Sequence, residues 1–349
     1  RDPLTDRLKR KQRPPDHCPG AVARTPMPAP KPHLPWTPGC IPLMLAPMQG
    51  LTNRSLRDLF AQWVRPDTLF TEFMRVAPGD TNKRLAATDL REIAATEHGI
   101  PLVVQLIGHG TEALVHGAQL AQEAGATHLN LNLGCPFGRM TSGLTGGGIL
   151  RKPELLQELL PALRAAIRCS FSIKLRAGYD DPQQIFSLLP LFEQAGVDFL
   201  VLHPRTVKQE YRGLADHGIT AQVVQATALP VIANGDIRTA AEGLRVLEQT
   251  RAAGLMLGRG AIADPLLFKR LRGELPDQEG RAAKAAMLQT YLKGLLSRYE
   301  ALFCGEQQVL GKVKAVLNPM DDPQVAKAVK ALKKSRSISQ FQDILSTLT

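Results

Sequence analysis

The sequence has few cysteines and no long hydrophobic run, and each of these absences excludes a class of protein. Its 5 cysteines are an odd number, widely spaced and without a Cys-x-x-Cys pair. This pattern excludes a secreted disulfide scaffold and argues against structural zinc, so we expect a reducing, cytoplasmic location and no metal. The apolar runs stop well short of the ~20 residues that a membrane-spanning helix needs, so we expect no membrane association. With 44% apolar residues among 349, the chain can still bury a large core.

Positive charge is concentrated at the two ends of the chain. The net charge is +11; residues 1–33 carry +5 (8 Lys and Arg against 3 Asp and Glu), and residues 279–349 carry another +5 (11 against 6). The segment 34–278 is therefore close to neutral, at +1. Basic ends on a neutral body suggest a polyanionic partner, although a solvated basic surface would give the same count.

Residues 1–42 differ in composition from the rest of the chain. They contain 11 of the 26 prolines and show no apolar periodicity. We therefore expect them to form a disordered, basic, proline-rich tail. They include no apolar segment of the kind found in secretory signals.

From residue 43 onward, short apolar runs alternate with segments of helical periodicity. Each run has the length of a strand, and most precede a helical pattern such as 112–123, 153–167, 184–195 or 240–249. Eight such units predict an α/β fold, a (β/α)8 TIM barrel over residues 43–276. A doubly wound open sheet is the alternative, but no glycine fingerprint follows the first strand. The predicted strands are 43–46, 69–73, 102–107, 128–133, 171–175, 199–203, 231–233 and 255–257.

The alternation stops near residue 277, and residues 277–349 predict a smaller all-α C-terminal domain. The expected helices are 281–299, 306–317, 324–335 and 338–348. Gly305 and the pairs Asn318-Pro319 and Asp322-Pro323 separate them. The many lysines here fit either a solvated helical face or a surface for a phosphate backbone.

Polar or reactive residues follow nearly every predicted strand. In a barrel these residues meet at the carboxyl ends of the strands, where the active sites of this fold lie. The turns Asn234-Gly235-Asp236 and Gly258-Arg259-Gly260 follow the last two strands. Barrel phosphate sites are commonly built from these two loops, in which glycine allows close approach of the backbone. The sequence therefore predicts a phosphate site here, with Arg259 supplying charge.

Three other strand ends carry residues that suit redox or acid–base chemistry. Lys174 would be a cation beside a cofactor anion or a developing negative charge, and His203 would suit an anionic ring edge. Cys135 opens a glycine-rich loop, where a thiol could be a nucleophile or a proton donor. Each residue also has a plainer interpretation: a surface lysine, a satisfied core histidine and a buried inert thiol.

Seven motifs stand at these strand ends, in order along residues 43–270: Leu45-Ala46-Pro47-Met48, Thr71-Glu72-Phe73, Leu133-Gly134-Cys135-Pro136, Ile173-Lys174-Leu175-Arg176, His203-Pro204-Arg205-Thr206, Ile232-Ala233-Asn234-Gly235-Asp236 and Leu257-Gly258-Arg259-Gly260. Together they resemble the motifs of the tRNA-dihydrouridine synthases. The segments 71–75 and 208–213 most resemble the C subgroup of bacterial enzymes, which modifies uridine 16. Two positions depart from the family: Asn130 stands where Asp is common, and Phe137 stands where a small residue usually follows Cys-Pro.

The resemblance implies an FMN-dependent barrel with a helical tRNA-binding domain at 277–349. Such an enzyme reduces the 5,6 double bond of selected uridines in tRNA with NADPH as electron donor, and we expect it to be a monomer. By the resemblance, Cys135 would give a proton to C5 as flavin hydride adds to C6. Flavin contacts would come from Ala46, Pro47, Met48, Gln105, Asn132, Lys174, His203, Asn234, Gly235, Asp236, Gly258 and Arg259, and RNA contacts from Arg139, Arg205, Lys312 and Lys314.

Three other functions fit parts of the sequence. An FMN barrel that acts on a small molecule would share the phosphate site and Lys174, but the basic helical end and the Cys-Pro loop argue against it. A non-catalytic RNA-binding barrel would not need Cys135, Lys174 and His203 together. A flavin-free lyase or isomerase would need paired carboxylates, whereas only Glu72 and Asp236 lie at strand ends.

Overall fold

The computed structural model describes residues 34–78, 84–93, 98–137 and 144–348. Residues 1–33, most of the predicted disordered tail, lie outside the described part. The remainder, 34–42, packs on the barrel: the buried Trp36 ring meets Phe199 edge-on, with 4.9 Å between centroids. The carbonyl oxygen of Pro42 also accepts a hydrogen bond from the Leu255 amide (2.9 Å). These residues therefore belong to the barrel and not to the tail, because burying the indole offsets the entropy of ordering them.

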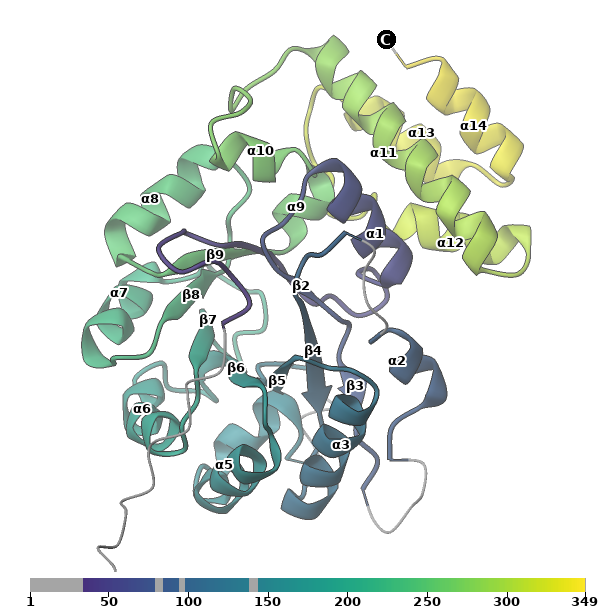
Figure 1. Cartoon of the computed structure of the whole chain (residues 1–349). Coiled ribbons are helices and arrows are strands. Elements are labelled where there is room, and N and C mark those ends of the chain that lie inside the picture. Colours follow the sequence, from purple (N-terminus) through teal and green to yellow (C-terminus); the bar gives the residue numbers. More distant parts are fainter. Residues whose placement is uncertain (1–33, 79–83, 94–97, 138–143, 349) are drawn as a thin grey trace, which may run out of the picture. The chain divides into compact units, whose positions relative to one another are not determined.

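A barrel of parallel strands forms the centre of the described chain (Figure 1). β2 and β3 pair with β4 one after the other and act as one interrupted strand, which leaves eight strand positions. A parallel bridge between Met44 and Thr68 closes the ring. The (β/α)8 prediction is confirmed, and the open-sheet alternative is wrong. The strands are β1 (Leu43–Leu45), β2 (Leu69–Phe70), β3 (Met74–Arg75), β4 (Leu102–Ile107), β5 (His128–Leu133), β6 (Ser170–Gly178), β7 (Phe199–Thr206), β8 (Val231–Asn234) and β9 (Gly254–Leu257), in the order β1-β9-β8-β7-β6-β5-β4-β2.

Helices surround the strands, and a second group of helices follows β9 along the chain (Figure 1). The helices of the barrel are α1 (Arg54–Trp63), α2 (Ala87–Arg91), α3 (Thr111–Glu123), the 3-10 helix η1 (Gly146–Arg151), α5 (Leu155–Ala166), α6 (Gln184–Gln194), α7 (His217–Ala226), α8 (Ala240–Thr250), α9 (Arg259–Ala263) and α10 (Leu267–Leu271). The C-terminal helices are α11 (Arg281–Leu302), α12 (Glu306–Ala315), α13 (Ala326–Lys334) and α14 (Ile338–Ser346), each overlapping a predicted helix.

Side-chain caps explain where several helices begin. Asn53 caps α1 by accepting a hydrogen bond from the Leu56 amide (3.2 Å), and Asp216 caps α7. Thr239 and Glu242 form a capping box at the start of α8. Each cap lies in a loop that follows the carboxyl end of a strand, so the caps also hold the loops in which functional residues are expected.

The barrel interior is apolar at one end and polar at the other. Side chains alternate along a strand, so residues two apart lie on the same face. On β7, Phe199 and Val201 pack inside the barrel, whereas Leu200 packs outward among the helices. His203 and Arg205 are the next residues of β7 on this inward-facing side. The end of the strand therefore brings polar groups into the barrel mouth.

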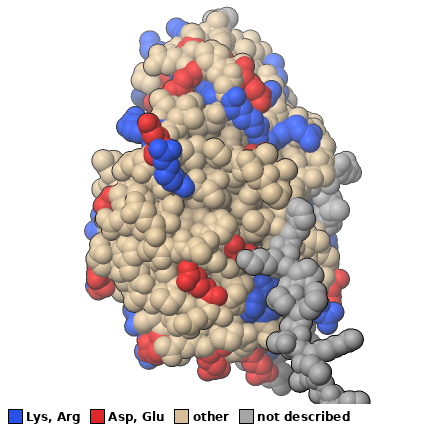
Figure 2. Space-filling model, turned by 60° about the vertical axis from the view of Figure 1, so that its left-hand side comes forward, with Lys and Arg blue, Asp and Glu red and all other residues tan. Residues whose placement is uncertain are grey.

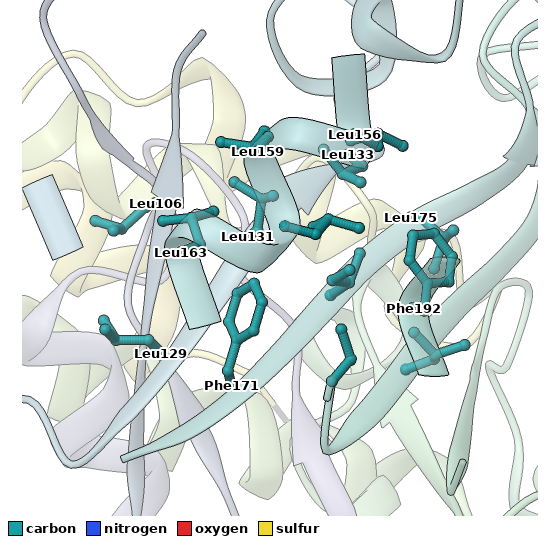
Figure 3. Close-up of a cluster of buried hydrophobic side chains, with 14 of the residues drawn as sticks. Leu106, Leu129, Leu131, Leu133, Leu156, Leu159, Leu163, Phe171, Leu175 and Phe192 are labelled. Atoms are coloured by element: carbon teal, nitrogen blue, oxygen red, sulfur yellow. The ribbon is translucent and has the colours of Figure 1, made fainter. Parts of the chain in front are cut away.

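The outward faces of the strands form the largest part of the core with the helices (Figure 3). Leu129, Leu131 and Leu133 of β5 belong to one buried cluster with Leu159 and Leu163 of α5. Complete burial of a leucine stabilises the fold by about 1.5–3 kcal/mol relative to exposure. This packing supports the strands whose ends carry the polar residues.

The C-terminal helices share a hydrophobic core with one side of the barrel. Phe60 of α1 lies against Tyr291 of α11, with 6.0 Å between ring centroids, and both belong to a cluster that also includes residues of β1, β9 and α12 to α14. At the end of this contact, the Asn53 amide donates to the Tyr299 hydroxyl (3.1 Å). A continuous core of this kind holds the helices firmly against the barrel.

Candidate active site

A pocket opens at the carboxyl ends of the strands, between the loops that follow β1, β7, β8 and β9. Ten of the twelve residues predicted to contact a cofactor line it. The other two, Gln105 and Asn132, lie on β4 and β5 and are almost fully buried. The lining consists of the predicted Ala46, Pro47, Met48, Lys174, His203, Asn234, Gly235, Asp236, Gly258 and Arg259, together with Tyr211, Ile237, Arg238, Met256 and Gly260.

Gly260 allows the loops after β8 and β9 to lie close together, and Gly235 allows the loop after β8 to lie against the loop after β7. A side chain on Gly260 would place its Cβ 2.1 Å from the carbonyl oxygen of Ile237. Gly235 has φ +131°, and a Cβ there would lie 2.9 Å from the Ala215 side chain. Neither position can carry a larger residue without a backbone shift. The contact holds Arg259 at the pocket wall.

Lys174 enters the pocket from β6, and no carboxylate pairs with it among the described residues. Its Nζ donates to Asn234 Oδ1 (3.0 Å), and Asn234 Nδ2 donates to the Met256 carbonyl (2.8 Å). Asn234 therefore orients the ammonium. Burial, together with the Arg176 charge, lowers the pKa of Lys174 to about 8. The group is still charged at neutral pH and is suited to face an anion.

His203 is held as a neutral imidazole. Arg205 Nη1 lies 2.9 Å from His203 Nε2, and because a guanidinium can only donate, Nε2 must accept. The ring hydrogen is therefore on Nδ1. Burial, and the charges of Lys174, Arg176, Arg205 and Arg259, lower the pKa of His203 well below its usual value. His203 can thus donate a hydrogen bond without carrying a charge.

Asp236 is the counter-charge of two arginines. Its Oδ2 lies 2.6 Å from Arg205 Nη2, and its Oδ1 lies 3.6 Å from Arg259 Nη2. The Ala215 amide also donates to Oδ2 (2.8 Å). The Arg259 guanidinium lies over the Tyr211 ring, 4.6 Å from its centroid, and its side chain stays 45% exposed. Asp236, predicted to contact a cofactor, here orients Arg259 and leaves that guanidinium accessible at the pocket.

Replacing Asp236 with alanine is expected to destabilise the fold by about 3 kcal/mol, because it leaves a buried arginine without its counter-charge. The Arg205 side chain is only 2% exposed. Urea unfolding of the purified variant and of the native protein measures the effect. Asp180→Ala is the matched control, since Asp180 pairs with Lys208 on the surface and its loss should change nothing measurable. Equal midpoints for the two variants would contradict this account of Asp236.

A chain of buried amides links β4, β5 and β6 beneath the pocket. Gln105 Nε2 donates to Asn130 Oδ1, and Asn132 Nδ2 donates to Gln105 Oε1, both at 2.8 Å. Asn130 Nδ2 donates in turn to Ser172 Oγ (2.8 Å). The chain fixes the orientation of all three amides. In this chain Gln105 uses its Oε1 atom and one of the two hydrogens on Nε2. The second Nε2 hydrogen is left for the predicted cofactor contact.

Asn132 connects this chain to the cysteine loop. Its Oδ1 accepts hydrogen bonds from the amides of Gly134 (3.0 Å) and Cys135 (2.9 Å). The Cys135 carbonyl accepts another from the Gly147 amide (3.1 Å). Burial raises the pKa of the Cys135 thiol, although a hydrogen bond from the Phe137 backbone acts in the opposite direction. The thiol therefore stays protonated at neutral pH and can serve as a proton donor.

Two residues missing from the predicted set join the cysteine loop to the pocket. Arg176 is buried and donates to the carbonyls of Gly134 (3.0 Å) and Thr206 (2.9 Å). Its guanidinium lies over the Tyr211 ring, 5.2 Å from the centroid. The spacing of Arg176, two residues after Lys174, could have predicted that both lie on one strand face. Tyr211 belongs to the segment 208–213, whose resemblance to the C subgroup is the signal that could have predicted its place, and it reaches the pocket from the long loop after β7.

The family model described as dihydrouridine synthase matches residues 44–337. The chain belongs to the dihydrouridine synthase family. The tRNA-dihydrouridine(16) synthase of Cupriavidus necator is 32% identical over 316 residues, which cover 88% of this chain and 97% of that protein. The probable tRNA-dihydrouridine synthase of Rhodobacter capsulatus is 35% identical over 235 residues (67% and 72%). The tRNA-dihydrouridine synthase B of Vibrio cholerae is 33% identical over 231 residues (66% and 70%).

Solved structures share the barrel with this dihydrouridine synthase. Histamine dehydrogenase from Rhizobium sp. 4-9 superposes with a TM-score of 0.53 at 12% identity, covering 73% of this chain and 48% of that one. A morphinone reductase variant in complex with tetrahydroNAD gives a TM-score of 0.50 at 15% identity, covering 68% and 88%. At these identities the likeness concerns the fold alone.

The side chains predicted to contact RNA have different surroundings in this dihydrouridine synthase. Arg139 lies outside the described residues. Arg205 is enclosed by Asp236 and His203, so it does not reach the surface as an RNA contact requires. Lys314 Nζ donates to the Ser335 carbonyl, and Lys312 lies over the Phe303 ring, 5.4 Å from its centroid. Both lysines are partly exposed on α12, and their RNA contacts stay predictions.

Two other kinds of feature are absent from the described residues. These residues include no helix long and apolar enough to cross a bilayer. They also include no group of three or more His, Cys, Asp or Glu side chains placed to bind a metal ion.

Proposed function

We propose that the protein binds FMN in the pocket and reduces the 5,6 double bond of a uridine in tRNA with electrons from NADPH. The observation that carries the proposal is the position of the Cys135 thiol, which feels the charges of Arg176 and Lys174, next to a pocket lined by Lys174 and Arg259. The chain also matches a tRNA-dihydrouridine(16) synthase over most of its length. We propose uridine 16 as the target because that relative, among others, is named for it. The enzyme would act as a monomer.

The donors of the pocket fit a flavin mononucleotide. Arg259 and the joined glycine loops would hold its phosphate, and Lys174 and His203 Nδ1 would face the polar edge of its ring. The cations that lower the pKa of His203 leave an excess of positive charge around the pocket. A phosphate and an anionic ring edge would balance that charge. Ala46 and Met48 offer the apolar wall that a flat ring needs.

When bound, FMN supplies the hydride that adds to C6 of the uracil. Cys135 would release the proton on Sγ to C5, and its raised pKa keeps that proton in place at neutral pH until the reaction needs it. Asn132 holds the two amides that shape the cysteine loop. Lys174, oriented by Asn234, would stabilise negative charge at the cofactor edge.

The exposed face of α13 supports contact with RNA by the C-terminal helices. Lys327, Lys330 and Lys334 recur on that face, whereas Val329 and Leu332 are buried against the neighbouring helices. On the face seen in Figure 2, Lys and Arg side chains are scattered among Asp and Glu. RNA binding would therefore depend on local rows of cations such as the three lysines of α13. Such rows neutralise phosphates and release counterions.

Anaerobic visible spectroscopy tests the proposed function. NADPH should bleach the flavin bands of the purified protein, and unmodified tRNA should restore them. tRNA with cytidine in place of uridine 16 is the matched control and should leave the flavin reduced. Reoxidation by a small enone without any need for tRNA would favour a small-molecule reductase. A protein that takes up no FMN would contradict the proposal.

Replacing Arg259 with alanine is expected to raise the dissociation constant of FMN about 10- to 100-fold, as the loss of a charged hydrogen bond does. Fluorescence titration of FMN with the flavin-free protein measures it. Arg168→Ala is the control, because Arg168 lines a separate pocket at the amino ends of the strands. Unchanged affinity in the Arg259 variant would place the phosphate elsewhere.

A further inference from the structure

Two aromatic side chains stand exposed beside the cysteine loop. Phe137 is 56% exposed and Tyr211 is 46% exposed, and their ring centroids lie 6.3 Å apart with the planes at 40°. Phe137 follows Cys135 by two residues. Leaving so much of a phenyl ring in water forgoes much of the ~1.5–3 kcal/mol that its burial would contribute. Exposed apolar groups at a site commonly mark a surface that a ligand covers.

Three side chains at the pocket surround the Tyr211 ring. Arg259 and Arg176 lie over the Tyr211 ring, at 4.6 and 5.2 Å from its centroid, and His203 lies 6.2 Å away. Tyr211 lines the pocket, whereas Phe137 does not. Phe137 is therefore an exposed ring at the rim of the pocket, next to Tyr211. A ligand could therefore place one part in the pocket and an adjacent part on Phe137, just outside the pocket.

We propose that Phe137 stacks on a nucleobase adjacent in sequence to the reacting uridine. The inference rests on the proposed function, since it requires RNA at this site. A uridine that enters the pocket must leave its base stack, and this exposes one face of a neighbouring base. An aromatic ring at the rim replaces the lost partner, and such stacking accepts any base because every base has a π-face. Phe137 thereby lowers the cost of extruding the uridine.

Substitutions that separate stacking from mere apolar contact test the proposal. Phe137→Ala and Phe137→Leu should each lower kcat/KM for tRNA about tenfold, as the loss of one base–aromatic stack does, whereas Phe137→Trp should retain it. FMN affinity and the rate of flavin reduction by NADPH should not change in any variant. Leu244→Ala, which removes another exposed apolar side chain, on α8, is the control. A leucine variant as active as the native protein would overturn the stacking role, as would slower reduction by NADPH in Phe137→Ala.

A substrate change locates the partner base. The test uses tRNA with an abasic nucleotide on one side of the target uridine. The native protein should reduce this tRNA with a kcat/KM about as low as that of Phe137→Ala on intact tRNA. Combining the two changes should cost no more than either alone, because both remove the same contact. Additive losses on both sides of the uridine would overturn the proposal. Failure of the native protein to reduce intact tRNA would instead contradict the proposed function, so the two failures are distinguishable.

Discussion

Replacing Cys135 with alanine is expected to slow the reduction of uridine in tRNA by about 10²–10⁴-fold, the usual contribution of a positioned general acid. Burial raises the pKa of this thiol, so at neutral pH it holds the proton that C5 of the uracil must receive. Alanine removes the proton source and leaves the pocket lining intact. Single-turnover reoxidation of the reduced flavin by tRNA, followed without oxygen, measures the rate of this step.

The controls for Cys135 separate the proton donor from the rest of the site. FMN content and reduction by NADPH should be unchanged in Cys135→Ala, because the thiol is not part of the pocket lining. Cys169→Ala is the matched variant: its thiol is also partly buried with a raised pKa, but it lies at the amino end of the barrel. Reduction of tRNA by Cys135→Ala at the native rate would assign the proton to another group.

Replacing Lys174 with methionine is expected to slow the reduction of bound flavin by NADPH about 10²-fold, the effect of removing one donor that stabilises developing negative charge. Methionine preserves the length and apolar stem of the side chain and removes only the ammonium. Stopped-flow bleaching of the flavin measures the rate, with Lys208→Met on the exposed surface as control. A native rate in the Lys174 variant would remove this residue from the cofactor edge.

The affinity for FMN should depend on pH through the titration of Lys174. The pKa of Lys174 is about 8 in the flavin-free protein, so the ammonium is charged below that pH and neutral above it. Because the charged form attracts the anionic cofactor, FMN affinity should fall as the pH rises through 8. The fall should be absent in Lys174→Met and present in Lys208→Met. A profile that stays flat in the native protein would contradict the role of Lys174.

The order of apolar runs and turn residues was enough to predict the barrel and the strand ends at which functional residues gather. β4 and β5 span the predicted 102–107 and 128–133, because an apolar run bounded by turn signals is a local property of the chain. α11 to α14 likewise overlap their predicted ranges. Ten predicted cofactor residues line one pocket, because parallel strands in a barrel end on the same face. Their cofactor contacts stay predictions.

Which of these side chains pair with one another depends on contacts between strands that are far apart in the sequence. Arg205 and Asp236 are 31 residues apart and are predicted to contact different ligands, yet the parallel pairing of β7 with β8 brings them together in one ion pair. In the same way, the amides of Gln105, Asn130 and Asn132 meet across neighbouring strands. Alternation along a strand shows which residues face inward, but the register between strands and the closure of the ring set which of them touch.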